Sequence, residues 1–381
     1  MIIFTNNYID EKMYWDNSIF LTNKQKEKLE REVDYICNEV KNIMLDNGLC
    51  VSLYLSGSLA RREPTCICVQ GEVKISSDFD FVVIYDKVIH SYKSINMVIS
   101  KIKRKFNSYD CSFATIEIEK LKYTSSFFKR DLMLNSCCPL YRELEINKDS
   151  WGECKIEMNN YVESIITQAC CYFLNTSLTK DKSNNYFFKD AGYHKVKLIL
   201  ECFRAYAFAC GESIVGYNDL ILSNINFELL ENYPRGIVNK CIQARELSMY
   251  EKVSDFNILQ LIDITFMKLF SSEEYSKKIC EELSHLESPI IIFQNISILL
   301  LLSFYNKYRW EDLYKQLDYI TFSIENVIAV KDMIKKYQEE RNSEYYEKII
   351  VEYRKIRNEY VKLLHKKNTA EDDFTDLLLI E

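Results

Sequence analysis

The sequence predicts an α+β fold: a small mixed sheet with its helices lies within residues 1–150, and a mainly α-helical domain follows over residues 151–381. Three observations predict it. Helical and strand-like patterns alternate in the first part of the chain, and long helical patterns dominate the second part. The 381 residues also include only 8 Gly and 4 Pro, whereas typical proteins contain about 7% Gly and 5% Pro. This scarcity of turn-forming residues argues against turn-dense all-β folds and favours long helices.

The first part of the chain begins with a predicted helix over residues 23–47. Its apolar residues recur at helical spacing, and Gly48 follows where a left-handed residue commonly ends a helix. Strand-like patterns then predict three strands, at 50–56, 78–85 and 111–119. A helical pattern between the last two strands predicts a helix at 94–106. Between the first two strands, residues 65–76 are predicted to form a small hairpin that turns near Gln70 and Gly71.

The second part of the chain contains the long helical patterns, at 158–174, 193–210, 255–270, 289–305, 324–337 and 343–365. The pattern at 289–305 is strongly apolar, but Gln294 and Asn295 interrupt it. It is also shorter than the roughly 20 apolar residues that a membrane-spanning helix needs. We therefore expect a buried helix and no membrane association.

Charge and cysteine usage narrow the possible partners and location. A net charge of −7 disfavours nucleic acid as a partner, although a local basic groove remains possible. The N-terminus lacks the basic and apolar regions of a secretory signal. The 14 cysteines form no C-x-x-C pair, and the 4 histidines lie away from any cysteine cluster. This usage favours reduced thiols in a cytoplasmic protein over a zinc site.

Chemically informative residues are concentrated in the stretch Tyr54–Asp86. Gly57 and Ser58 directly follow a predicted strand, and a Gly-Ser turn presents backbone N–H groups and a hydroxyl to an anion such as phosphate. Asp78 and Asp80 begin the next strand two residues apart, so their carboxylates project to one face and can share a divalent cation. A phosphate turn beside two metal-binding carboxylates suits phosphoryl or nucleotidyl transfer.

The pattern G-S-x-A-R followed by S-D-x-D and an apolar run resembles the signature of the DNA polymerase β-type nucleotidyltransferase superfamily. The G-S-x-A-R form is similar to that of its minimal and antibiotic-modifying branches. The resemblance implies a nucleotidyltransferase core with a mixed sheet, followed by a helical domain. It also implies a nucleoside triphosphate as substrate and Mg²⁺ or Mn²⁺ as cofactor. It covers the first part of the chain alone and says little about the acceptor.

Residue by residue, the resemblance assigns Gly57 and Ser58 to the β- and γ-phosphates and Asp78 and Asp80 to the metal. Arg61 matches the arginine of G-S-x-A-R, which either contacts phosphate or pairs with an acid.

Two features depart from the family pattern. The family often has Gly after that arginine, where this chain has Arg62, and Glu63 keeps the acidic position that follows. The insert 65–76 lengthens the gap between Ser58 and Asp78, and it is a candidate for shaping an acceptor pocket.

The sequence leaves more than one candidate for the third carboxylate of such a site. Active members place an acid on the third strand, where it helps to activate the acceptor hydroxyl. Glu117 is the first candidate because it lies between two isoleucines in the predicted strand, and Glu119 and Asp110 are nearby acids. An alternative alignment places Ser112 at that position, which leaves the third acid absent.

The expected function is metal-dependent transfer of a nucleoside monophosphate from a nucleoside triphosphate to an acceptor hydroxyl, with release of pyrophosphate. A small molecule or a carbohydrate is the favoured acceptor. The alternative is a catalytically impaired nucleotide-binding or scaffold protein of the same fold.

Overall fold

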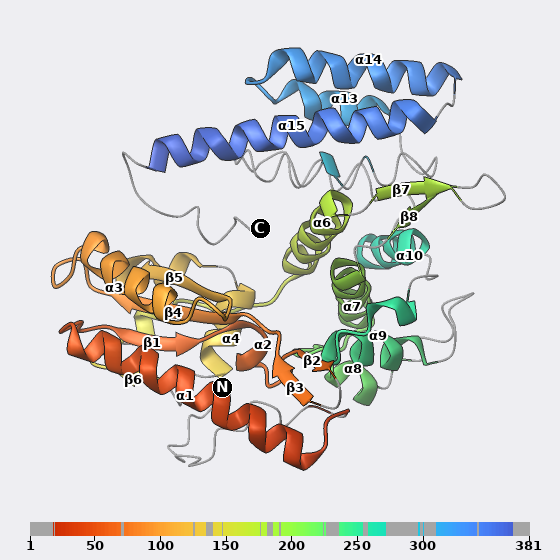
Figure 1. The fold of residues 1–381 in the computed structure, drawn as a ribbon. Coiled ribbons are helices and arrows are strands. Elements are labelled where there is room, and N and C mark those ends of the chain that lie inside the picture. Colours follow the sequence, from red (N-terminus) through yellow and green to blue (C-terminus); the bar gives the residue numbers. More distant parts are fainter. Residues whose placement is uncertain are drawn as a thin grey trace. The chain divides into compact units, whose positions relative to one another are not determined.

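The computed structural model describes most of the chain. The described residues are 18, 20–69, 72–124, 126–134, 140–146, 148–175, 177–180, 186–189, 192–223, 225, 236–253, 258–271, 296–297, 300, 310–340 and 343–368. They form a mixed α+β structure in which helices predominate (Figure 1).

The chain divides into two compact units. The first comprises residues 1–160 and 211–252, and the second comprises 161–210 and 253–381. This division differs from the domains expected at 1–150 and 151–381, because the segment 211–252 groups with the N-terminal part of the chain. This segment contacts Glu63 through Tyr217, Asn218 and Arg245.

Helix α1 (Asn23–Asp46) opens the first unit and agrees with the helix predicted over 23–47. Thr22 caps its N-terminus: the Thr22 hydroxyl accepts from the Gln25 N–H, and the Gln25 side chain accepts from the Thr22 N–H. At the other end Gly48 has a left-handed backbone with φ of 68°. One apolar face of the helix is buried in the core, through Leu29, Val33, Ile36, Cys37, Val40 and Met44.

The first unit contains a four-stranded mixed sheet. Its strands are β1 (Ser52–Leu55), β4 (Phe79–Tyr85), β5 (Cys111–Glu117) and β6 (Tyr141–Arg142), in the spatial order β5-β4-β1-β6. β4 and β5 are parallel and connected by helix α3 (Tyr92–Lys105), whereas β1 is antiparallel to β4 and to β6. The three strands predicted from the sequence are confirmed, and β6 is an addition.

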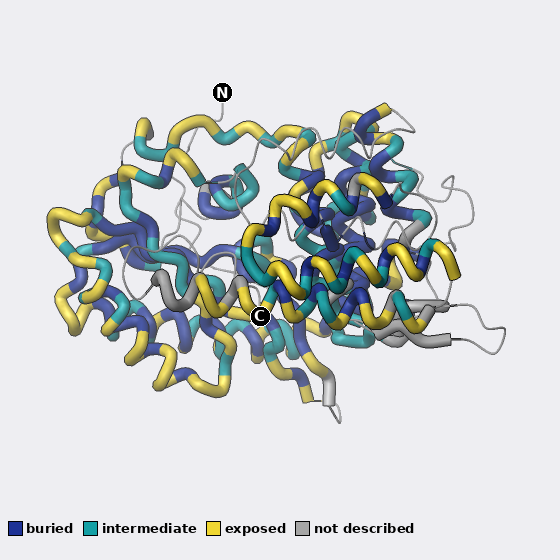
Figure 2. Tube along the Cα trace, turned by 90° about the horizontal axis from the view of Figure 1, so that it is seen from above, coloured by how far each residue is buried: buried dark blue, intermediate teal, exposed yellow. Residues whose placement is uncertain are grey.

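Both faces of this sheet are buried in apolar clusters. Alternate residues of β4, from Phe79 to Tyr85, pack on one face with α1 and α3. The residues between them, Val82 and Ile84, belong to a second cluster on the other face with Ile116. Because the strands are apolar on both faces, a polar residue within them stands out as a candidate for function. Buried, intermediate and exposed positions in the described part of the chain are coloured in Figure 2.

Shorter elements surround the sheet. Strands β2 (Cys66–Val69) and β3 (Glu72–Ile75) form an antiparallel hairpin, which confirms the hairpin predicted at 65–76; its expected tip at 70–71 lies outside the described residues. The 3₁₀ helix η1 (Ile118–Tyr123) takes the last two residues of the predicted third strand, 118 and 119. The remaining helices of this unit are α2 (Gly57–Ala60), α4 (Ser126–Leu134), α5 (Lys148–Trp151), α8 (Asp219–Leu222) and α9 (Ile237–Glu246). A further 3₁₀ turn, η3, spans Tyr250–Val253.

The second unit is mainly helical. Its described helices are α6 (Met158–Asn175), α7 (Gly192–Ala209), α10 (Ile258–Phe270), α13 (Trp310–Asp318), α14 (Ile324–Glu340) and α15 (Ser343–Asn368). These match the helical patterns predicted from the sequence, with α13 as an addition. The pattern at 289–305 lies almost entirely outside the described residues. A hairpin of β7 (Ser177–Lys180) and β8 (Tyr186–Lys189) was not expected from the sequence.

None of the helices in the described part of the chain combines the length and the apolar character that a membrane span requires.

Candidate functional site

Gly57 lies at the turn between β1 and α2, directly beside the start of β4. Its φ of 65° is left-handed, and a Cβ atom at this position would overlap with Oδ2 of Asp80. The turn is also tied to β4 by its backbone, because the Ser56 N–H donates to the Asp80 carbonyl oxygen at 2.8 Å. Glycine is therefore required twice, by the backbone conformation and by the neighbouring carboxylate. The expected phosphate turn and the expected metal-binding strand are thus in contact.

Asp80 is partly buried and faces the next strand as well as the turn. Its Oδ1 accepts a hydrogen bond of 2.7 Å from the Ser112 hydroxyl. Ser112 is the residue that pairs with Asp80 in the parallel register of β4 and β5. Asp78 lies two residues earlier, immediately before β4, and is exposed. The two aspartates and the Gly57 turn therefore lie at the same end of the sheet.

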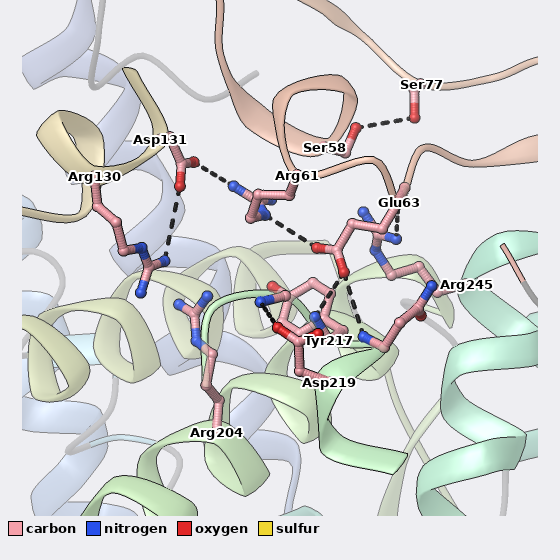
Figure 3. A network of polar contacts seen from close by, with 12 residues as sticks. Ser58, Arg61, Glu63, Ser77, Arg130, Asp131, Arg204, Tyr217, Asp219 and Arg245 are labelled. Carbon is pink, nitrogen blue, oxygen red and sulfur yellow. Dashed lines mark hydrogen bonds and ion pairs between the residues drawn. The ribbon is translucent and has the colours of Figure 1, made fainter. Parts of the chain in front are cut away.

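The Ser58 hydroxyl belongs to a group of hydroxyls beside this turn. Ser58 Oγ lies 3.1 Å from Oγ of Ser77, the residue that precedes Asp78 (Figure 3). Ser77 is buried, and its Oγ accepts from the Thr65 N–H at 2.6 Å and lies 3.1 Å from the Thr65 hydroxyl. These contacts hold the start of β4 against both α2 and the entry of the β2–β3 hairpin.

Arg61 follows the same turn, and its positive charge is paired with two acidic side chains of the protein. Its Nε donates to Glu63 Oε1 at 3.0 Å, and its Nη1 is ion-paired with Asp131 of α4 (Figure 3). Burial alone would lower the pKa of Arg61, but Asp131 and Glu63 outweigh that effect, so its pKa is raised. Of the two roles considered from the sequence, Arg61 takes the pairing with acids.

Glu63 connects the turn to the returning segment 211–252. It is only 2% exposed, and its Oε2 accepts from the backbone N–H groups of Tyr217 and Asn218 at 2.6 and 3.3 Å. The Arg245 guanidinium donates to the Glu63 carbonyl oxygen at 2.5 Å (Figure 3). Gly216 is needed here, because a Cβ atom would lie 2.8 Å from Glu63 Oε2. We refer to Arg61, Glu63, Asp131, Tyr217 and Arg245 as the buried polar network.

Sequence reasoning noted the acid at Glu63 but missed its partners. Tyr217 and Arg245 are 154 and 182 residues away along the chain, so no local pattern connects them with Glu63. The available signal was Gly216, one of only 8 glycines in the chain.

The structure places Glu117 far from the other predicted site residues. In the β4–β5 register Glu117 pairs with Tyr85, five residues beyond the pair of Asp80 and Ser112. At about 3.3 Å per residue this is a separation of roughly 16 Å. Because five is odd, Glu117 also projects from the opposite face of the sheet. Its carboxylate instead lies within 3.9 Å of Lys87 and 3.4 Å of Lys120.

The expected role of Glu117 as third carboxylate is therefore corrected. The residue of β5 that pairs with Asp80 is Ser112, the alternative considered from the sequence.

The carboxylates present fit a magnesium ion that is bound together with a nucleotide. The described residues contain no group of three or more His, Cys, Asp or Glu side chains arranged to hold a metal ion. Asp78 and Asp80 offer two carboxylates, and Mg²⁺ is commonly held by one or two carboxylates together with substrate phosphates and water. The arrangement thus places a left-handed glycine turn, two acids and a hydroxyl at one end of a sheet. No protein-family model, no curated protein and no solved structure matches this chain.

Proposed function

We propose that this protein is a metal-dependent nucleotidyltransferase that moves a nucleoside monophosphate from a nucleoside triphosphate to an acceptor hydroxyl. The observation that carries the proposal is the contact of Gly57 with the Asp80 carboxylate. The contact places a turn that could bind phosphate directly beside a carboxylate that could bind a metal ion.

In this proposal the turn binds the β- and γ-phosphates through backbone N–H groups and the Ser58 hydroxyl. Asp78 and Asp80 would hold Mg²⁺ or Mn²⁺, which supplies charge neutralisation for the triphosphate and the leaving pyrophosphate. The protein's own contribution is positioning, because Gly57 and Asp80 fix the phosphates relative to the acids before the reaction begins.

The buried polar network supports this positioning. Arg61 and Glu63 fasten the end of α2 to α4 and to the segment that contains Tyr217. Both ends of the Gly57 turn are therefore held, one by the sheet and the other by buried ion pairs. A turn fixed in this way loses little freedom when phosphate binds.

The proposed acceptor is a small molecule or a carbohydrate that carries a hydroxyl group. The net charge of −7 favours a small molecule or a carbohydrate over a large nucleic acid. A cytoplasmic site would have free access to nucleoside triphosphates and magnesium.

A second candidate is a nucleotide-binding protein without turnover. The observation that favours it is Ser112, a hydroxyl where active members of the superfamily have an acid. Without a base on the third strand, an incoming acceptor would be poorly activated.

A thermal-shift assay combined with pyrophosphate detection separates the two candidates. The protein is incubated with each of the four ribonucleoside triphosphates and Mg²⁺ or Mn²⁺, with and without a pool of sugars and aminoglycosides. The transferase predicts a rise in Tm with at least one nucleotide and release of pyrophosphate, and Asp80→Asn should abolish both. A rise in Tm without pyrophosphate supports the second candidate. If no nucleotide changes Tm, both are wrong.

Glu117→Gln is the matched control for this assay. It removes a carboxylate from the same sheet, roughly 16 Å from Asp80 on the register given above. We expect it to keep the nucleotide-induced rise in Tm. Loss of that rise in Tm would show that Glu117 contributes to nucleotide binding after all.

A further inference from the structure

Ser112 and Gly57 contact different oxygens of the Asp80 carboxylate. Oδ2 lies against Gly57, and Oδ1 accepts the 2.7 Å hydrogen bond from the Ser112 hydroxyl. Ser112 is exposed on β5, whereas its neighbour Cys111 is buried. A serine hydroxyl is thus held at a fixed position beside the carboxylate, with the phosphate turn at the other carboxylate oxygen.

The orientation of this hydroxyl matters for its reactivity. Ser112 donates its proton toward Asp80, so the oxygen lone pairs point away from the carboxylate and toward the exposed side. If the pyrophosphate portion of a triphosphate occupies the Gly57 turn, the α-phosphorus lies next to Asp80. Ser112 Oγ and the Gly57 turn lie against different oxygens of Asp80. An in-line displacement at that phosphorus would therefore have Ser112 Oγ as the attacking atom and the pyrophosphate on the turn as the leaving group.

We propose that Ser112 is a nucleotide acceptor and that the protein nucleotidylates itself at this residue. This inference rests on the proposed function, because it uses the same triphosphate site. In the step, Ser112 Oγ forms a bond to the α-phosphorus, and the bond from the α-phosphorus to the bridging oxygen breaks. Pyrophosphate leaves with that electron pair, and the hydroxyl proton passes to Asp80 Oδ1, which already accepts its hydrogen bond, and from there to solvent. The products are a serine phosphodiester with the nucleoside monophosphate and free pyrophosphate.

Neighbouring hydroxyls meet these conditions less well. Ser58 lies on the phosphate turn itself, so its oxygen is on the side of the leaving group, and it also contacts Ser77. Thr115 is on the same strand as Ser112, but the two are separated by an odd number of residues and project to opposite faces. Thr115 pairs with Val83 rather than with an acid. The proposal therefore singles out one residue.

Intact-mass spectrometry of the full-length protein tests the proposal. The protein is incubated with each ribonucleoside triphosphate and Mg²⁺ or Mn²⁺, without any added acceptor, and peptides are then mapped. We expect a gain of one nucleoside monophosphate on the peptide that contains Ser112. The gain should be first order and independent of protein concentration, because the triphosphate site and the acceptor Ser112 belong to the same molecule.

Four variants make the result specific. Ser112→Ala should lose the mass gain while keeping the rise in Tm with nucleotide, and Ser112→Thr should retain part of the gain because it keeps the hydroxyl. Asp80→Asn should lose both the mass gain and the rise in Tm. Thr115→Val, the control on the same strand, should behave as the unaltered protein.

The outcomes separate this inference from the proposed function. Suppose that nucleotide raises Tm and that pyrophosphate is released when acceptors are added, but that the protein gains no mass. This result overturns self-modification and leaves the transferase intact. A mass gain that persists in Ser112→Ala also overturns the inference. If no nucleotide raises Tm and no mass gain occurs, both proposals are wrong.

Discussion

The Asp80 carboxylate occupies the space into which a side chain at residue 57 would extend. This contact joins two features that a local sequence pattern shows only separately, a glycine after one strand and an acid on the next. Gly57→Ala therefore combines two penalties. A left-handed alanine costs about 1–2 kcal/mol, and the overlap with Asp80 adds roughly 1–3 kcal/mol of the kind seen on overpacking.

Gly48→Ala is the matched control for this prediction. Gly48 also has a left-handed backbone, with φ of 68°, but a Cβ atom there would have no neighbour within 4 Å. We expect urea unfolding to show a larger loss for Gly57→Ala than for Gly48→Ala. Adding Asp80→Ala should recover part of the difference. Equal losses at the two glycines would mean that the carboxylate does not crowd residue 57.

Arg62 is a non-glycine residue held in a left-handed conformation, with φ of 59°. In the motif that this sequence resembles, the residue at this position is often glycine. Arg62 is exposed. Arg62→Gly should therefore raise the free energy of unfolding, by about 0.5–1 kcal/mol after the greater entropy of an unfolded glycine is subtracted. Arg62→Ala removes the same side chain but keeps the strain, so it should show no gain. Urea denaturation of both variants checks this, and a destabilised Arg62→Gly would contradict it.

Local patterns predicted most of the elements. The helix α1 and the strand β4 each follow from a periodicity that a few consecutive residues establish, because burial of one helical face or of both strand faces selects apolar residues at fixed spacing. The Gly57 turn and the two aspartates were also found in this way. What the pattern could not give is which residue of the third strand faces Asp80.

That register depends on contacts between strands rather than on the third strand itself. Glu117 and Ser112 both lie on β5, and shifting the register would exchange their surroundings. The observed register stacks Phe113 on Phe81, with ring centroids 5.0 Å apart; Phe81 is buried in the core, and the partly buried Phe113 packs against it. Packing therefore sets the pairing, and packing is not visible in β5 alone. The return of residues 211–252 to the first unit is non-local for the same reason.

Glu63 is the centre of the buried polar network, so removing its charge should be costly. Glu63→Gln keeps the shape of the side chain but leaves Arg61 and two backbone N–H donors facing a neutral amide. Breaking a buried ion pair in this way typically costs about 3–5 kcal/mol. Glu119→Gln is the comparison, because Glu119 pairs with Lys87 at the surface and should change stability little.

The readout for Glu63 includes nucleotide binding as well as stability. At a temperature where Glu63→Gln remains folded, the nucleotide-induced rise in Tm should be smaller, because the end of the turn is no longer fixed. A variant as stable as the unaltered protein would show that the network contributes nothing to the fold.

Tyr109 gives the protein a specific sensitivity to alkaline pH. Its hydroxyl donates to Glu32 Oε1 at 2.7 Å, and burial, followed by the contact with Glu32, raises its pKa to about 12 from an ordinary value of 10.0. Between these two pH values the unfolded chain releases the proton and the folded chain retains it. Fewer protons are then bound in the unfolded state, so stability falls as pH rises through this window.

Tyr109→Phe removes both the hydrogen bond and the ionisation. At neutral pH it should be less stable than the unaltered protein by about 1–2 kcal/mol, because a partly buried hydrogen bond to a charged acceptor is lost. From pH 10 toward pH 12 the difference should shrink, because the unaltered protein alone pays the cost of keeping Tyr109 protonated. Urea unfolding of both proteins at intervals of pH measures this difference directly, and other alkaline groups affect both equally. A difference that stays constant to pH 12 would show that the tyrosine titrates alike in the folded and unfolded chains.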